Sequence, residues 1–99
     1  MEEDKKVVKA TVYDKSMTVL RIIEHGYSYG YNIAYVILFK DFDDNLYQYL
    51  KFDDPVDYSK CRIDNVCKLI IRGYPKNRYP ILKIVHRWEP EYDSLKEDW

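Results

Sequence analysis

Residues 33–39, Ile-Ala-Tyr-Val-Ile-Leu-Phe, constrain the fold most, because all seven are apolar and polar residues border them on both sides. Most of the seven are β-branched or aromatic, and such side chains fit a pleated strand better than a helix. No polar residue alternates with them, so a strand here is expected to be covered on both faces. We therefore predict a central strand, with any recognition surface at its flanks rather than along it.

Length and composition favour a single domain over residues 1–99, since the chain is 46% hydrophobic and 33% charged. Alternating or apolar patterns predict further strands at 6–13, 17–25, 46–52 and 81–88, with turns at 14–16 and 41–45. The predicted fold class is α+β: an antiparallel sheet of about five strands with one main amphipathic helix packed on one face.

The predicted helix covers residues 55–72. Asp54 followed by Pro55 is a strong start signal, and Gly73 followed by Pro75 is a stop signal. A second, shorter amphipathic helix is compatible with the spacing of Tyr92, Leu95 and Trp99. With a helical period, the residues predicted to face the sheet are Val56, Ile63, Val66, Cys67, Ile70 and Ile71.

The opposite face of this predicted helix carries Tyr58, Cys61, Asn65 and Leu69. These are either scattered surface residues or a seam for a second protomer, giving a homodimer, or for another partner. Cys61 and Cys67 would lie about 120° apart around the helix, one exposed and one buried. No disulfide, metal site or cofactor is therefore predicted.

Two flanks of the central strand are candidates for partner binding. Tyr27, Tyr29 and Tyr31 project from one face wherever the chain is extended, and the Tyr, Ser and Gly mixture suits adaptable contacts. The plainer interpretation is a Tyr-rich connection over the sheet edge.

After the strand, an acidic turn holds Asp41, Asp43 and Asp44. It lacks the Gly and Glu that an EF-hand needs, so it forms either solvated turn acids or a partner surface. A second acidic group, at 53–57, is expected about 20 Å away, beyond the strand at 46–52.

Positive charge is concentrated in residues 60–87, which carry eight Lys or Arg against Asp64 alone. Its cationic aromatic loop could pair with phosphates and stack on bases, or could be a plain connector held by its two prolines. The net charge of −1 argues against a strongly nonspecific nucleic-acid binder. The residues of this alternative nucleic-acid site are Tyr74, Lys76, Arg78 and Tyr79.

No pattern indicates catalysis. His25 and His86 have no Cys or Ser partner at a recognisable spacing, and there is neither a Gly-rich phosphate loop nor a nucleophile elbow. No enzyme activity and no catalytic residue are predicted. A high charge content with a single glutamine, Gln48, is typical of a thermostable protein from a hyperthermophile.

The Tyr-rich hairpins, Asp41-Phe42-Asp43-Asp44, the Asp54-Pro55 helix start and the final run 81–85 together resemble the small proteins of archaeal filamentous viruses, such as Acidianus filamentous virus. That group is similar to a family with a branch of anti-CRISPR proteins against a type I-D complex. The resemblance implies a non-enzymatic viral accessory protein that binds a host protein in the host cytoplasm. No apolar run approaches the roughly 18 residues of a transmembrane helix, so no membrane association is predicted. The alternative is a small viral nucleic-acid-binding protein using residues 60–87.

Overall fold

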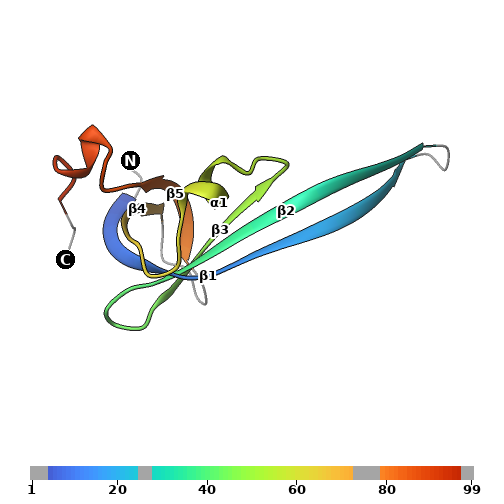
Figure 1. Cartoon of the computed structure of the whole chain (residues 1–99). Helices are drawn as coiled ribbons and strands as arrows, with labels where there is room; N and C mark the ends of the chain where they lie inside the picture. Colours follow the sequence, from blue (N-terminus) through green and yellow to red (C-terminus); the bar gives the residue numbers. More distant parts are fainter. Residues whose placement is uncertain (1–4, 25–27, 73–78, 97–99) are drawn as a thin grey trace.

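Five strands form a closed barrel in the computed structural model, which describes residues 5–24, 28–72 and 79–96 (Figure 1). The strands lie around the barrel in the order β1-β2-β3-β5-β4, and β4 pairs back onto β1. Every pairing is antiparallel except that of β3 with β5. The elements are β1 (Lys5–Glu24), β2 (Ser28–Lys40), β3 (Leu46–Phe52), α1 (Val56–Lys60), β4 (Val66–Arg72), β5 (Tyr79–Val85) and a 3₁₀ turn, η1 (Pro90–Tyr92).

This strand order, with a helix between β3 and β4, is the topology of the OB-fold, a five-stranded Greek-key barrel. The length of β1 allows the barrel to close. Its first part, residues 5–11, pairs with β4, and the part from residue 11 onward pairs with β2. The register shifts between Val12 and Asp14, and such a bulge bends a strand and increases its twist.

The core fills the barrel with alternate side chains from all five strands. Two of its largest members are tyrosines whose hydroxyls bond to acids at the barrel ends. Tyr47 donates to Asp41 over 2.6 Å, and Tyr49 donates to Asp57 over 2.7 Å. The buried core residues are Val8, Ala10, Val12, Ile37, Phe39, Tyr47, Tyr49, Cys61, Cys67, Leu69, Ile71 and Ile84.

The predicted α+β fold with a main helix over 55–72 is wrong, because α1 ends at Lys60 and residues 66–72 form strand β4. The start is where the sequence indicated: the Asp54 carboxylate accepts a hydrogen bond from the Val56 N–H over 3.1 Å. Asp64 then turns the chain with a positive φ of 73°. Of the residues predicted to form one helical face, Val66, Cys67, Ile70 and Ile71 lie in β4 and alternate across it. Val56 lies in α1 and Ile63 in the turn after it, and both are 50% exposed. Most of the described residues are in strands.

The predicted turn at residues 14–16 is also absent, because β1 continues through them. Residues 33–39 do lie centrally, in β2 between β1 and β3. Ile37 and Phe39 are buried in the barrel, whereas Val36 and Leu38 on its outer side are only half-buried, so the two faces are not equally covered.

The C-terminal tail forms the single 3₁₀ turn η1 and no amphipathic helix within the described residues, and Trp99 lies outside them. Among the helices in the described part of the chain, none is long and apolar enough to cross a membrane.

Candidate functional site

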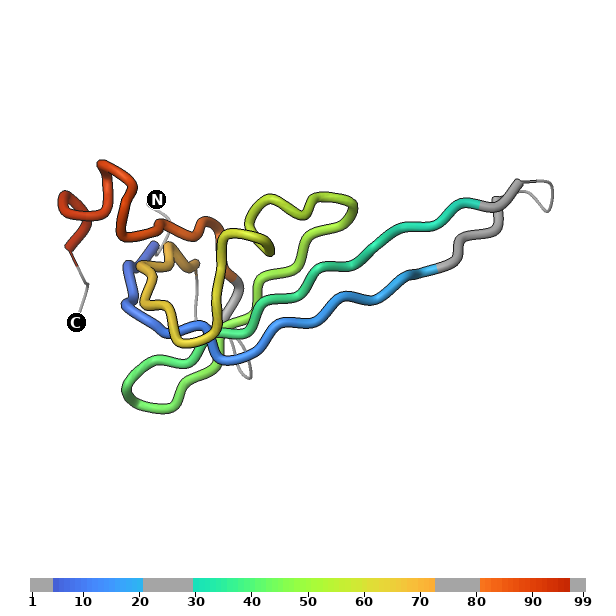
Figure 2. The backbone as a smooth tube through the Cα atoms, viewed as in Figure 1, coloured from blue at the N-terminus to red at the C-terminus, as the bar shows by residue number. Residues whose placement is uncertain are grey.

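A two-stranded arm leaves the barrel (Figure 2). Residues 16–24 of β1 pair with 28–36 of β2. Strand β4 accompanies β1 only as far as residue 11, and β3 accompanies β2 only from Lys40 to Ala34, where β3 ends. Asp53 closes the sheet at this point, since its N–H donates to the Ile33 carbonyl over 2.9 Å and its carboxylate accepts from the Ile33 N–H over 3.0 Å. Beyond these two hydrogen bonds, the described part of the arm consists of β1 and β2 alone.

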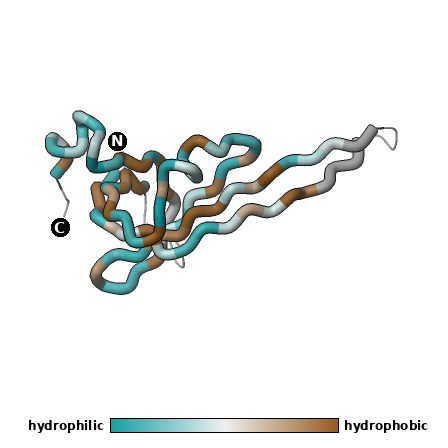
Figure 3. The backbone as a smooth tube through the Cα atoms, in the orientation of Figure 1, coloured by the Kyte–Doolittle hydropathy of each residue, from teal (hydrophilic) through white to brown (hydrophobic). Residues whose placement is uncertain are grey.

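One face of the arm carries an apolar strip, defined here as Met17, Val19, Tyr31 and Ile33. Met17, Val19 and Tyr31 are 57%, 60% and 64% exposed. Val19 lies directly opposite Ile33 in the register, and Met17 lies opposite Tyr35. These positions lie on the same side of the two strands as the residues that point into the barrel. Apolar residues therefore continue from the core out along the arm (Figure 3).

A second apolar surface, here called the outer face, lies on the solvent side of β2 and β3. Leu50 and Phe52 are 45% and 51% exposed, and they pair with Val36 and Ala34 across the two strands. Barrels of this topology commonly bind their ligands on the corresponding face. The outer face and the arm strip project from opposite sides of the same ribbon.

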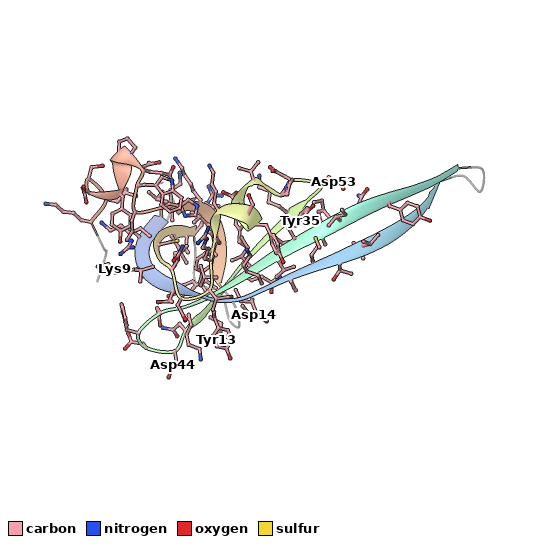
Figure 4. The ribbon with its side chains drawn as sticks, in the orientation of Figure 1. Lys9, Tyr13, Asp14, Tyr35, Asp44 and Asp53 are labelled. Atoms are coloured by element: carbon pink, nitrogen blue, oxygen red, sulfur yellow. The ribbon has the colours of Figure 1, made fainter. Side chains whose placement is uncertain are left out.

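Acidic residues border the outer face at both ends. Asp44 and Asp53 lie at opposite ends of β3 (Figure 4), which is the separation expected from the strand length. The predicted partner residues Asp43 and Asp44 are exposed in the turn. Asp41 is structural: its carboxylate accepts bonds from Tyr47 and Asn45, which outweigh burial and lower its pKa.

The tyrosine row is only partly described. Tyr31 and Tyr29 lie in β2, opposite Arg21 and Ile23, and Tyr31 is exposed. Tyr27 lies outside the described residues. Of the three tyrosines, Tyr31 is the one whose side chain the structure describes, and it lies on the same face as Val19 and Ile33.

The predicted dimer or partner seam does not exist. Cys61 and Leu69 are fully buried at 0% exposure, so neither can contact a second protomer. The Tyr58 ring packs 5.2 Å from that of Tyr35, and Asn65 bonds to the backbone of Val12. These four residues were placed together only by the helical period, which the strand β4 replaces.

The alternative nucleic-acid site is largely outside the described residues, which exclude Tyr74, Lys76 and Arg78; Tyr79 opens β5. Two other cations of the basic segment are engaged in holding the C-terminal segment. Lys68 is 9% exposed and donates to the carbonyls of Tyr92 and Leu95, each over 2.7 Å. Lys83 pairs with Glu91 over 2.6 Å.

The structure also brings together Cys61, Cys67 and His86, whose ligand atoms all lie within 4.8 Å of one another. Their exposures are 0%, 1% and 2%. The prediction that one cysteine is exposed and that the two cannot meet is wrong, because Cys61 follows α1 and Cys67 lies in β4. The alternation of Cys67, Leu69 and Ile71 was the available signal for this strand.

Within this cluster, the two cysteines shift each other's pKa, whereas the pKa of His86 responds mainly to burial. The Cys61 thiol bonds to the Cys67 sulfur, which raises the pKa of Cys61 and lowers that of Cys67. Burial lowers the pKa of His86 and favours the neutral imidazole. His86 Nδ1 lies 3.7 Å from Cys67 Sγ, and its Nε2 is buried with no hydrogen-bond partner among the described residues.

No protein-family model, curated protein or solved structure matches the chain. The assignment of the OB topology therefore rests on the strand order alone. A shared topology does not by itself assign a function.

Proposed function

We propose that this chain is a non-enzymatic binding protein that attaches to a partner protein through its arm strip and outer face. The observation that carries the proposal is the exposure of Met17, Val19 and Tyr31 on one side of a two-stranded arm. An isolated two-stranded hairpin is marginal in water, and clustered exposed apolar side chains mark interaction sites. A partner that covers the strip stabilises the arm and removes these side chains from water.

Charge defines the chemistry of this partner. The apolar outer face lies between the acidic turn with Asp43 and Asp44 and the acidic pair Asp53 and Asp54. The complementary partner surface is apolar with a rim of Lys or Arg. Proteins that themselves bind nucleic acid carry such basic surfaces. This agrees with a viral accessory protein that inhibits a host defence complex in the host cytoplasm.

Binding of a single-stranded nucleic acid is the second candidate, because the β2–β3 face of OB barrels binds oligonucleotides and Phe52 is exposed there for stacking. The local charge opposes it. Lys51 lies 3.9 Å from Asp54, and the acids at both ends of the face repel phosphates. A protein partner therefore fits this surface better.

The double variant Met17→Asp/Val19→Asp is expected to weaken partner binding by at least about 30-fold, since a central apolar contact contributes about 2 kcal/mol. Both side chains are more than half exposed, so the folded state should be little affected. Tagged protein captures its partner from host lysate, and affinity is then measured with the purified partner. Leu82→Asp is the matched control, because Leu82 is 42% exposed on β5, away from the arm.

Wild-type affinity in Met17→Asp/Val19→Asp, with a normal melting temperature, would remove the arm strip from the site. Capture that disappears after nuclease treatment, together with oligonucleotide binding that falls steeply with salt, would favour the nucleic-acid alternative. Asp43→Lys/Asp44→Lys separates the two further. It should weaken binding to a basic protein partner and strengthen binding to an oligonucleotide.

A further inference from the structure

Three side chains with metal-binding chemistry meet at the end of the barrel although they come from separate parts of the chain. Cys61 follows α1, Cys67 lies in β4, and His86 directly follows β5. Antiparallel pairing of β4 with β5 places the second and third of these near each other. All three are buried, so the cluster is part of the interior and independent of the binding surfaces proposed above.

The geometry fits a thiolate–imidazole metal site. Zinc–sulfur and zinc–nitrogen bonds of about 2.3 and 2.0–2.1 Å at a tetrahedral angle place sulfur and nitrogen about 3.6 Å apart. The Cys67 Sγ to His86 Nδ1 distance is 3.7 Å. The three ligand atoms lie within 4.8 Å of one another, against about 3.8 Å between two zinc-bound thiolates. Closure around an ion therefore requires these separations to shorten by at most about 1 Å.

Hydrogen bonds do not account for the burial of this imidazole. Its Nε2 has no partner in the described part of the chain, and its Nδ1 faces only sulfur. A buried polar ring with so few bonds is costly unless another interaction offsets the desolvation. Coordination of a cation through Nδ1 is such an interaction.

We propose that Cys61, Cys67 and His86 bind a thiophilic metal ion, best matched by Zn²⁺. Two thiolates neutralise the double charge of zinc, and this suits a fully buried site. Three protein ligands leave the fourth zinc position to a water or another small ligand. Copper(I), which favours the same soft ligands, is the competing ion and leaves a net negative charge in the interior.

The backbone around the ligands is already held in place. The Cys61 carbonyl accepts from Lys15 Nζ over 2.6 Å, and its N–H donates to the Asp57 carbonyl over 3.1 Å. The His86 N–H donates to the Glu89 carboxylate over 2.6 Å. The His86 ring stacks on Trp88 with centroids 4.6 Å apart. The metal would join α1, β4 and the end of β5 into one unit.

The binding of Zn²⁺ to these three ligands conserves charge and protons. Zn²⁺ exchanges two S–H protons for two zinc–sulfur bonds and takes the lone pair of Nδ1, releasing two protons to solvent. No oxidant or reductant is involved. At pH values below the pKa of the thiols and above that of the His86 imidazole, affinity should therefore rise about 100-fold per pH unit, because two protons leave for each ion bound.

The test is titration of the reduced full-length chain with Zn²⁺, and separately with Co²⁺, against a chromophoric chelator. We expect one equivalent bound, a cobalt–thiolate charge-transfer band, proton release, a higher melting temperature and altered Trp88 fluorescence. Cys67→Ser and His86→Ala should each weaken zinc by at least about 100-fold, since even outer-shell changes cost 10–100-fold. Trp88→Phe keeps all three ligands and should retain affinity while losing the fluorescence change.

Failure of the folded, reduced wild type to take up either Zn²⁺ or Cu⁺ would overturn the proposal without depending on any variant. A wild type that binds Cu⁺ and excludes Zn²⁺ would keep the site and overturn its assignment to zinc. Equal zinc affinity in Cys61→Ser/Cys67→Ser would show that the ion binds elsewhere. Isolation of the chain with a Cys61–Cys67 disulfide that resists reduction would also overturn it.

Discussion

Leu69→Glu is expected to leave no stably folded protein at 25 °C, whereas Ile70→Glu should fold and lose about 1 kcal/mol. Leu69 is fully buried in the barrel. Replacing it removes an apolar side chain worth about 2–5 kcal/mol and introduces an unpaired carboxylate into the core. The sum is comparable to the whole stability of a small domain, about 5–15 kcal/mol. Ile70 lies on the outer side of β4, half-buried and opposite Lys83.

This pair of variants distinguishes the strand from the helix that the sequence suggested. In a helix over 55–72, Leu69 would face outward and Ile70 inward, so the order of the two effects would reverse. Circular dichroism and urea denaturation of both variants measure the difference. A folded Leu69→Glu beside an unfolded Ile70→Glu would contradict the strand β4.

Two periodicities were present in the segment from Val66 onward. Val66, Cys67, Ile70 and Ile71 fit a helical period, while Cys67, Leu69 and Ile71 fit a strand period. The strong start at Asp54-Pro55 favoured the helix, and α1 does begin there. The β-branched content of 66–72 was the better guide to its structure, because the helix needs only one turn to satisfy its start signal.

The arm could not be predicted from local composition. Asp14, Lys15 and Ser16 have turn chemistry, yet the strand pairs through them with β2. The physical reason is tertiary: the chain bulges beside Asp14, and Lys15 reaches across to the Cys61 carbonyl and lies over the Tyr58 ring at 4.1 Å. By contrast, strand β3 and the acidic turn before it followed from period-2 alternation and turn residues alone.

The candidate sites also fall into two groups, those that local sequence predicts and those that depend on tertiary contacts. The placement of the two acidic groups at opposite ends of β3 follows from strand geometry. The meeting of Cys61 with His86 depends on the pairing of β4 with β5 and on the end of α1. Residue spacing in one sequence predicts neither the pairing of these two strands nor the early end of the helix.

Asp41→Ala is expected to lower the free energy of unfolding by about 2–4 kcal/mol, because it removes the hydrogen bonds to a carboxylate, one of them from a buried residue, and opens the turn. The Asp41 carboxylate accepts from the Tyr47 hydroxyl over 2.6 Å and from the Asp43 and Asn45 N–H groups, each over 2.9 Å. Tyr47 is 0% exposed in the folded protein, so this bond belongs to the packed core. Urea denaturation at neutral pH measures the change, and Asp43→Asn is the exposed control.

The Asp41 carboxylate should also make the free energy of unfolding depend on pH in the acidic range. Burial raises the pKa of Asp41, but the bonds from Tyr47, Asn45 and Asp43 outweigh it and hold the folded pKa below its ordinary value of 3.8. A carboxylate with a depressed folded pKa stabilises the protein above its unfolded pKa, and that contribution is lost as the pH falls through the folded value. Denaturation midpoints should therefore drop less steeply below pH 3.8 in Asp41→Asn than in the wild type.

Tyr47→Phe tests whether the Tyr47–Asp41 bond is the main source of these effects. In a double-mutant cycle with Asp41→Ala, the coupling energy should reach about 1–3 kcal/mol, as for directly bonded residues. Phe keeps the ring that fills the barrel and removes the buried hydroxyl, so Asp41→Ala should cost less in that background. Strictly additive effects would mean that Asp41 acts through the backbone N–H groups of its turn and not through the core.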